Sequence, residues 1–291
     1  ADGGSPAGES AAGFPNGNTN EQEPPQRGPG SNRHSATHER ELLLIESAMR
    51  FGRLDEAYGR SRAAGGLPDS TLITLAEELA ARGRYRESIQ VAIRANAAPP
   101  AESGTSGSGS GDATPARVLQ LRYPRAYAPL FDEVLAEEEV APALLYALVR
   151  EESLFDPRIE SVAGAVGLTQ LLPSTALDIG RRMRITVTDL TDPLLNLRVG
   201  ARYVSMLEEQ FGDLFRALAA YNAGQGRVRS WERRWPALDG LLFHRAIPFA
   251  ETYRHIRKVV VSAVYYGYLY ENRLPEDTLQ TLFPVLVPGG E

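Results

Sequence analysis

Apolar side chains recur every three or four residues along most of this chain, and this spacing predicts a succession of amphipathic helices. Between residues 39 and 98 the spacing is carried by two groups of positions: Leu43, Leu44, Ala48 and Phe51, then Leu72, Leu75, Ala76 and Leu79. No alternation of apolar and polar residues is long enough to predict a useful strand. The predicted fold class is therefore mainly α.

The second half of the chain predicts further helices with defined ends. One spans about 142–155. Another begins after Asp192, a capping residue that is followed by proline at the first helical position, and should end at Gly212. A longer helix follows Pro248, and its buried stripe consists of Phe249, Tyr253, Ile256, Val260, Ala263 and Gly267.

Segments rich in glycine, proline and serine separate these helical parts. Residues 1–38 contain twelve glycines or prolines, and Phe14 is their only large apolar side chain, so we expect a disordered tail there. The run from Gly104 to Gly111 has the composition of a flexible linker. The predicted organisation is a disordered tail at 1–38, a helical-repeat segment at 39–98, a flexible linker at 99–116, a main helical domain at 117–275 and an extended tail at 276–291.

One short turn sequence occurs twice in the first helical segment. Gly-Arg-Leu-Asp-Glu-Ala begins at Gly52 and Gly-Arg-Tyr-Arg-Glu-Ser begins at Gly83, 31 residues apart, which is close to the period of helix-pair solenoids. The pair resembles a tetratricopeptide-like fragment. Because such arrays usually need three or more units, the pair either packs on its neighbouring domain or is the remainder of a longer superhelix. We favour the second interpretation, in which the repeats could bind a protein partner.

Composition excludes several classes of function. The net charge is −6, so a nucleic-acid partner is not expected. There is no cysteine and there are four histidines, so we predict neither a metal nor any other cofactor. The longest apolar stretch, Val259 to Tyr270, is shorter than the ~20 residues that span a bilayer, so we expect no transmembrane segment.

Candidate chemistry begins at two adjacent carboxylates, Glu151 and Glu152, at the end of an apolar helix. Glu152 continues the buried face formed by Leu145, Leu148 and Val149, whereas Arg150 lies on a different face. Burial raises the pKa of a carboxyl group, and a glutamic acid that stays protonated near neutrality can donate its proton to a leaving oxygen. Cleavage of a glycosidic bond requires such a proton donor.

Four sequence blocks follow one another in an order that identifies a family. They are Glu152-Ser153, the segment SVAGAVGLTQ from Ser161 to Gln170, the segment AYNAG from Ala220 to Gly224, and Pro248-Phe249-x-Glu251-Thr252. Together, from about Tyr123 to Tyr268, they resemble the catalytic domain of soluble lytic transglycosylases. The resemblance implies a lysozyme-like α-helical domain within 117–275. It also implies a carbon–oxygen lyase activity on peptidoglycan, namely non-hydrolytic cleavage of the β-1,4 bond between N-acetylmuramic acid and N-acetylglucosamine to leave 1,6-anhydro-muramyl ends.

The resemblance also implies roles for individual residues. Glu152 is the catalytic acid and then the base, since Asp156 is the only other carboxylate that follows nearby and Asp156-Pro157 is typical of a turn. In this mechanism the substrate's own N-acetyl oxygen and C6 hydroxyl serve as nucleophiles, an exception to the two-carboxylate rule. The implied substrate-binding residues are Ser161, Gln170, Tyr221, Asn222 and Glu251.

Small residues and departures from the family pattern complete the candidate site. Gly164, Ala165 and Gly167 are expected to shape the wall of the cleft. Thr169 and Leu172 replace common methionines, so we expect an altered apolar lining. In the last block His255 stands where tyrosine is usual and Tyr253 where arginine is frequent, which leaves the local hydrogen bonds undetermined.

Two alternatives remain open at this point. A lysozyme-like muramidase would hydrolyse the same bond and leave a reducing end. A peptidoglycan-binding or assembly scaffold would keep the repeats but lack turnover; the presence of Glu152, Gln170, Tyr221 and Asn222 argues against it. In each case the substrate implies a periplasmic or other cell-envelope location.

Overall fold

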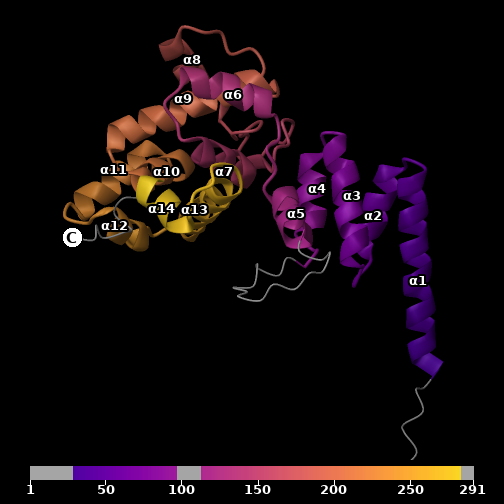
Figure 1. The fold of residues 1–291 in the computed structure, drawn as a ribbon. Helices are drawn as coiled ribbons and strands as arrows, with labels where there is room; N and C mark the ends of the chain where they lie inside the picture. Colours follow the sequence, from indigo (N-terminus) through magenta and orange to yellow (C-terminus); the bar gives the residue numbers. More distant parts are fainter. Residues whose placement is uncertain (1–28, 97–112, 283–291) are drawn as a thin grey trace, which may run out of the picture.

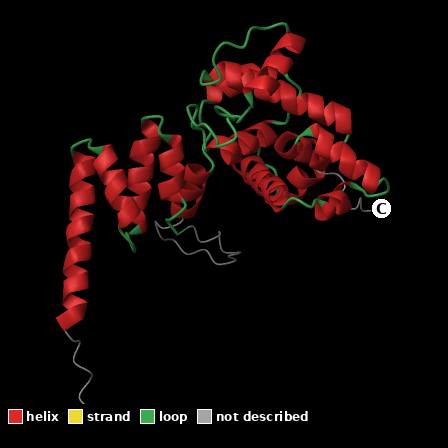
Figure 2. Cartoon of the chain, turned by 180° about the vertical axis from the view of Figure 1, so that it is seen from behind, coloured by secondary structure: helices red, strands yellow, loops and turns green. Residues whose placement is uncertain are grey.

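A computed structural model describes residues 29–96 and 113–282 of the chain. Within these ranges the fold is built from helices and contains no strand, only isolated bridges that pair Val166 with Glu160 and with Leu171 (Figure 2). This confirms the prediction of a mainly α fold. Two hydrophobic cores organise it, one beneath the first five helices and a larger one among the helices that follow.

The first core belongs to a row of helices at one end of the molecule (Figure 1). These are α1 (Pro29–Arg50), α2 (Leu54–Ala63), α3 (Asp69–Ala81), α4 (Tyr85–Ala92) and α5 (Ala113–Arg122). The repeated turns at Gly52 and Gly83 have the same geometry, because both glycines adopt left-handed conformations with φ of 69° and 72°. The assignment of these helices to the tetratricopeptide class, and a partner for them, stay predictions.

Three predicted boundaries differ from the structure. Helix α1 begins at Pro29, inside the predicted tail 1–38, because proline suits the first turn and the polar residues after it extend the amphipathic helix that follows. Helix α5 begins at Ala113, inside the predicted linker. Helix α14 (Pro275–Leu282) occupies the start of the predicted extended tail, where Pro275 again begins a helix. The remaining parts of these predictions, 1–28, 97–112 and 283–291, lie outside the described residues.

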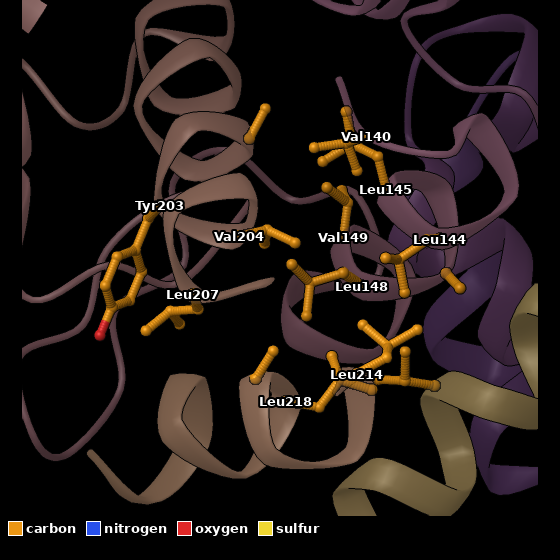
Figure 3. Close-up of a cluster of buried hydrophobic side chains, with 14 of the residues drawn as sticks. Val140, Leu144, Leu145, Leu148, Val149, Tyr203, Val204, Leu207, Leu214 and Leu218 are labelled. Carbon is orange, nitrogen blue, oxygen red and sulfur yellow. The ribbon is translucent and has the colours of Figure 1, made fainter. Parts of the chain in front are cut away.

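The second core surrounds α7 (Pro142–Ser153), the helix that ends in the Glu151-Glu152 pair. Leucines of α7 and its Val149 interdigitate with Val204, Leu207, Leu214 and Leu218 from two neighbouring helices (Figure 3). Helix α7 also lies along α13, and so it is buried on all sides. The helices around it are α6 (Ala128–Glu137), α8 (Pro173–Met183), α9 (Pro193–Phe211), α10 (Leu214–Ala223), α11 (Gln225–Arg234), α12 (Gly240–Ala246) and α13 (Ala250–Tyr270).

Several predicted helix ends are confirmed. The Asp192 carboxylate accepts a hydrogen bond from the Leu195 amide at 2.7 Å and caps α9, which ends at Gly212 with φ of 62°. The helix expected after Pro248 is α13, and it begins at Ala250. None of the described helices combines the length and the apolar character needed to cross a membrane.

The two cores meet at the start of α4. The Tyr85 ring packs edge-on against Tyr127 and Phe155, with ring centroids 5.5 and 6.4 Å apart. Arg86 forms an ion pair with Asp156 at 3.1 Å, directly after the end of α7. Residue Asp156 is thus committed to an ion pair with the N-terminal helices.

Candidate active site

Glu152 lies in the last turn of α7, and its side chain is 15% exposed. Desolvation, together with the negative charges of Glu151 and Glu251, raises the pKa of this carboxyl group from its ordinary value of 4.5 to about 8. The group is therefore protonated at neutral pH and is still close enough to the surface to meet a substrate. The structure places Glu152 where the sequence analysis expected it.

The adjacent carboxylate has a different environment. Glu151 forms an ion pair with Arg150 and accepts a hydrogen bond from the Ser262 hydroxyl of α13 at 2.5 Å. The Arg150 guanidinium also lies 4.3 Å from the centre of the Tyr123 ring and donates to the Arg122 carbonyl at 2.8 Å. Arg150 does lie on a different face from Glu152, but that face is buried as well, because α13 and the chain around Tyr123 cover it. Glu151 is consequently a partner of Arg150, whereas Glu152 is not part of that ion pair.

The third titratable group of the site comes from α13. His255 is 10% exposed, and its Nε2 atom lies 3.5 Å from Oε1 of Glu152. Burial lowers the pKa of the imidazole to about 4, although the negative charge of Glu151 opposes the shift. At neutral pH both groups are uncharged, so this contact is not an ion pair. Sequence analysis identified His255 only as a departure from the family pattern.

The chain turns sharply directly after Glu152. Ser153 donates a hydrogen bond from its hydroxyl to the Leu168 carbonyl at 2.8 Å and accepts one from the Phe155 amide at 3.1 Å. Leu154 and Phe155 both have positive φ, 51° and 63°, a conformation that costs energy for residues other than glycine. The Ser153 hydroxyl thus joins the end of α7 to the glycine-rich loop, and this loop bounds the site.

Two predicted substrate-binding residues stabilise the loop itself. The Gln170 amide group donates to the carbonyls of Ile159 and Gly167, both at 3.0 Å. The Ser161 hydroxyl accepts from the Ala165 amide at 3.0 Å. Their contact with a substrate stays a prediction, and their observed role is to hold the loop conformation.

Gly167 and Thr169 have structural roles that the sequence analysis did not assign. A Cβ atom on Gly167 would lie 2.2 Å from the Leu190 carbonyl oxygen, so glycine is required here by close packing rather than by the cleft wall. Thr169 is fully buried, and its hydroxyl donates to Asn196 Oδ1 at 2.6 Å. The expectation that Thr169 alters the lining of the cleft is therefore wrong, because the polar side chain of Asn196 holds it in the interior. Leu172 is 42% exposed and can line a surface.

Helix α10 carries the next two predicted residues, and Tyr221 lies close enough to Glu152 for the two groups to interact. The Tyr221 hydroxyl donates to the Thr169 carbonyl at 2.6 Å, and burial together with the charge of Glu152 raises the pKa of this phenol well above its ordinary value. The Asn222 side-chain oxygen accepts a hydrogen bond from the Thr252 hydroxyl at 2.7 Å. Thr252 was not predicted as a site residue, although it belongs to the last of the four sequence blocks, beside Glu251.

A second carboxylate does approach Glu152, but it is not Asp156. Glu251, at the start of α13, is exposed and lies close enough for its charge to raise the pKa of Glu152. The expectation that Asp156 is the only nearby carboxylate was wrong, because it took account only of neighbours along the chain. Glu251 lies near Glu152 because α13 packs on α7.

Taken together, the site contains a buried protonated carboxyl group with a neutral imidazole and a phenol nearby, set in an all-helical domain. Such a carboxyl group can act as a general acid at neutral pH and as a base after it has lost its proton. A buried acid of this kind on an all-helical fold is the combination that the resemblance to lysozyme-like domains predicts.

Comparisons with known proteins find a family model that matches part of the chain. Residues 129–242 match the model described as the transglycosylase SLT domain. The matching segment contains three of the four sequence blocks, and it includes Glu152, Gln170, Tyr221 and Asn222. The match lies inside the predicted domain 117–275, whose exact boundaries stay a prediction.

Individual relatives are similar over the same region. The soluble lytic murein transglycosylase of Escherichia coli (strain K12) is 35% identical over 52% of this chain and 24% of its own length. A putative soluble lytic murein transglycosylase of Haemophilus influenzae is 34% identical over 54% of this chain and 28% of its own length. The chain thus spans about a quarter of the length of these curated relatives.

Solved structures extend the similarity to the N-terminal helices. The 70 kDa soluble lytic transglycosylase from E. coli superimposes with a TM-score of 0.62 and 26% identity, covering 81% of this chain and 36% of that protein. An inactive mutant of the lytic transglycosylase Slt from Pseudomonas aeruginosa has the same TM-score of 0.62, with 27% identity over 81% of this chain and 38% of its own. The lysozyme-like fold expected from the sequence is confirmed.

Proposed function

We propose that this protein is a peptidoglycan lytic transglycosylase. It would cleave the β-1,4 bond between N-acetylmuramic acid and N-acetylglucosamine without water and leave a 1,6-anhydro-muramyl end. The observation that carries the proposal is the Glu152 carboxyl group, which is buried in the last turn of α7 with a pKa raised to about 8 inside the segment that matches the SLT family.

The proposed reaction uses Glu152 twice. The protonated carboxyl group first donates its proton to the glycosidic oxygen, and the bond from that oxygen to the anomeric carbon of the muramoyl residue breaks. The N-acetyl oxygen of the same sugar stabilises the anomeric carbon. The C6 hydroxyl oxygen then forms the new bond to that carbon, and the Glu152 carboxylate takes the hydroxyl proton. The acid is regenerated, and no water is consumed.

Neighbouring residues support this double role. Glu151 is neutralised by Arg150 and Asp156 by Arg86, so neither is available as a second catalytic carboxylate. Glu251 is exposed at the edge of the site and would orient polar groups of the substrate together with Asn222. Tyr221 would stabilise charge that develops on the reacting sugar, since its ring is held beside the site by the hydrogen bond to Thr169.

The decisive experiment is mass analysis of muropeptides released from purified peptidoglycan by the protein and by its Glu152→Gln variant. We expect anhydro products, each one water lighter than the hydrolytic product, and a fall of about 10²–10⁴-fold in rate for the variant. The matched control is Glu276→Gln, the same chemical change at an exposed position on α14, which should leave the rate unchanged.

Other outcomes would favour the two alternatives. Reducing-end products that depend on Glu152 would indicate a hydrolytic muramidase. Binding to peptidoglycan without any turnover would indicate a scaffold. Because the substrate is a cell-wall polymer, the proposed location is extracytoplasmic, and the periplasm is the specific compartment that we propose. A protein partner for helices α1–α5 belongs to the same proposal.

A further inference from the structure

An unsatisfied nitrogen atom lies beside the proposed acid. Nε2 of His255 is fully buried, and no atom of the described residues makes a hydrogen bond to it. Buried polar atoms nearly always have partners, so an isolated ring nitrogen needs a specific explanation. Oε1 of Glu152 lies 3.5 Å from this nitrogen.

The distance between Nε2 and Oε1 is slightly longer than a hydrogen bond, as is common in an enzyme without bound substrate. Catalytic hydrogen bonds are often long or poorly aligned in the unbound state and shorten in the complex with substrate. Both side chains project from long helices, α7 and α13, that pack along each other. Their separation is therefore set by the packing of the helices and not by a loop, so a small rotation of either side chain can close the gap.

The charges around the imidazole keep it neutral. Glu151 and Glu152 approach it from α7, while Lys258 and Glu251 lie on α13 itself. The positive charge of Lys258 opposes protonation of the ring, and Glu151, which favours it, is already paired with Arg150. Burial decides the outcome, and the ring carries a single proton at neutral pH. A neutral imidazole can carry that proton on either nitrogen.

We propose that His255 is a positioning residue for Glu152, in which the Nε2–H tautomer donates a hydrogen bond to Oε1 and leaves Oε2 to carry the acid proton toward the substrate. The inference rests on the proposed function. It explains the unsatisfied nitrogen, and it assigns separate tasks to the two oxygens of one carboxyl group.

This hydrogen bond also acts in the second half of the reaction. Once Glu152 has lost its proton, the same N–H faces a carboxylate, and a hydrogen bond to an ionised acceptor is stronger than one to a neutral group. His255 therefore favours the ionised form of Glu152 without adding a charge. If the donor is removed, the pKa of Glu152 should rise further and the step that transfers its proton should slow.

The first test does not depend on activity. Nitrogen NMR of ¹⁵N-histidine-labelled full-length protein distinguishes ring tautomers, and the chain has four histidines to assign. His244 is an internal reference, since its Nε2 lies 3.2 Å from the Tyr253 carbonyl and must donate to it. We expect His255 to be the Nε2–H tautomer at neutral pH and to titrate well below 6.5. The Nδ1–H tautomer, or titration at the ordinary value, would overturn the proposal even if the protein is a transglycosylase.

The second test is kinetic and uses three variants. His255→Phe keeps an aromatic ring but removes the donor, and we expect kcat to fall about 10-fold or more and the basic limb of the pH–rate profile to move to higher pH. His255→Tyr and His255→Gln keep a donor and should retain kcat within about 3-fold. Thermal unfolding of each variant separates loss of the hydrogen bond from loss of the fold.

The outcomes are distinguishable from failure of the proposed function. If the unaltered protein gives no anhydro products, the kinetic test does not apply and the tautomer measurement alone decides the role of His255. If the protein is active but His255→Phe has an unchanged pH profile, or if the three variants lose activity equally, His255 is only a packing residue and the proposal is wrong.

Discussion

The two helical regions of this molecule differ in where their charged side chains lie. In α1–α5 the ionised side chains lie on the surface and pair within or between helices, as Arg82 does with Glu78 at 2.5 Å, with both side chains more than 40% exposed. The core beneath them is apolar apart from small hydroxyl side chains. Around α7, by contrast, Arg150, Glu151, Glu152 and His255 are all largely buried. A charged group in an interior is costly unless it is paired or neutralised.

The difference in the burial of charged groups separates the region with candidate chemistry from the region without it. The N-terminal helices need only a matching apolar face, and this requirement is visible in sequence periodicity. The α7 region buries two neighbouring carboxyl groups in different environments: Glu151 forms an ion pair with Arg150, whereas burial raises the pKa of Glu152. One of the adjacent glutamates thus stabilises the domain while the other retains a reactive proton.

The largest expected effect on stability comes from breaking the buried ion pair. Glu151→Gln leaves the buried guanidinium of Arg150 without a counter-charge, and we expect the free energy of unfolding to fall by about 3–5 kcal/mol. Chemical denaturation followed by circular dichroism would measure it. The matched control is Glu78→Gln in the exposed pair with Arg82, which should cost no more than ~0.5 kcal/mol. Equal losses in the two variants would remove the contrast between the regions.

A substitution in the N-terminal core should act on that region alone. Leu79, on α3, is fully buried, and Leu79→Ala removes apolar contacts and leaves a cavity that costs about 2–4 kcal/mol. Hydrogen exchange should show increased opening of α1–α4, with little change in α7 and α13. Leu43→Ala, at a position 66% exposed, is the control and should have little effect. Increased exchange throughout α7 would mean that the two cores unfold as one unit.

The smallest expected change in the free energy of unfolding is an increase, and it depends on pH. The pKa of Glu152 is raised in the folded protein to about 8, so the stability associated with its proton is fully present below about 4.5 and is lost as the pH rises through about 8. Glu152→Gln cannot ionise, and we expect it to be more stable than the unaltered protein at pH 8. The pKa difference sets an upper limit of about 4 kcal/mol, which the partial solvent exposure of the side chain lowers to about 1–3 kcal/mol.

Unfolding measurements at pH 5, 6.5 and 8 would test this trend. The difference between the variant and the unaltered protein should be near zero at pH 5 and increase with pH, while Glu276→Gln on the exposed face of α14 should show no such increase. A difference that is independent of pH would mean that Glu152 is ionised in the folded protein, and the assignment of its proton would be wrong.

Much of the fold was predictable because it depends on local patterns. The helical periodicity around Leu72 to Leu79, the cap at Asp192 and the stop at Gly212 all involve residues within a few positions of one another. Two of the three boundary errors occurred at proline. The helix that begins at Pro29 lies in a segment that composition assigned to a tail, and the helix that begins at Pro275 extends into one, because a low content of apolar residues predicts poor burial but does not prevent the extension of a helix.

The candidate site was predictable in its residue types but not in its contacts. The block around Ser161 to Gln170 marked the loop, yet Gly167 and Thr169 proved to serve the packing of the loop against Asn196 and not the surface of the cleft. Arg150 was placed on a second helix face without any indication that this face is also covered. In each case the missing information was a neighbour from a distant part of the chain.

The sequence by itself determined the helical class, the order of the elements and the position of the proposed acid, because periodicity, caps and the order of motifs are properties of neighbouring residues. Only the tertiary structure decided the proton states of the acid and its surroundings. The pKa of Glu152 depends on desolvation and on Glu251, and the state of His255 depends on the packing of α13 against α7. Those interactions join residues about one hundred positions apart, and a charge responds to distance in space and not to distance along the chain.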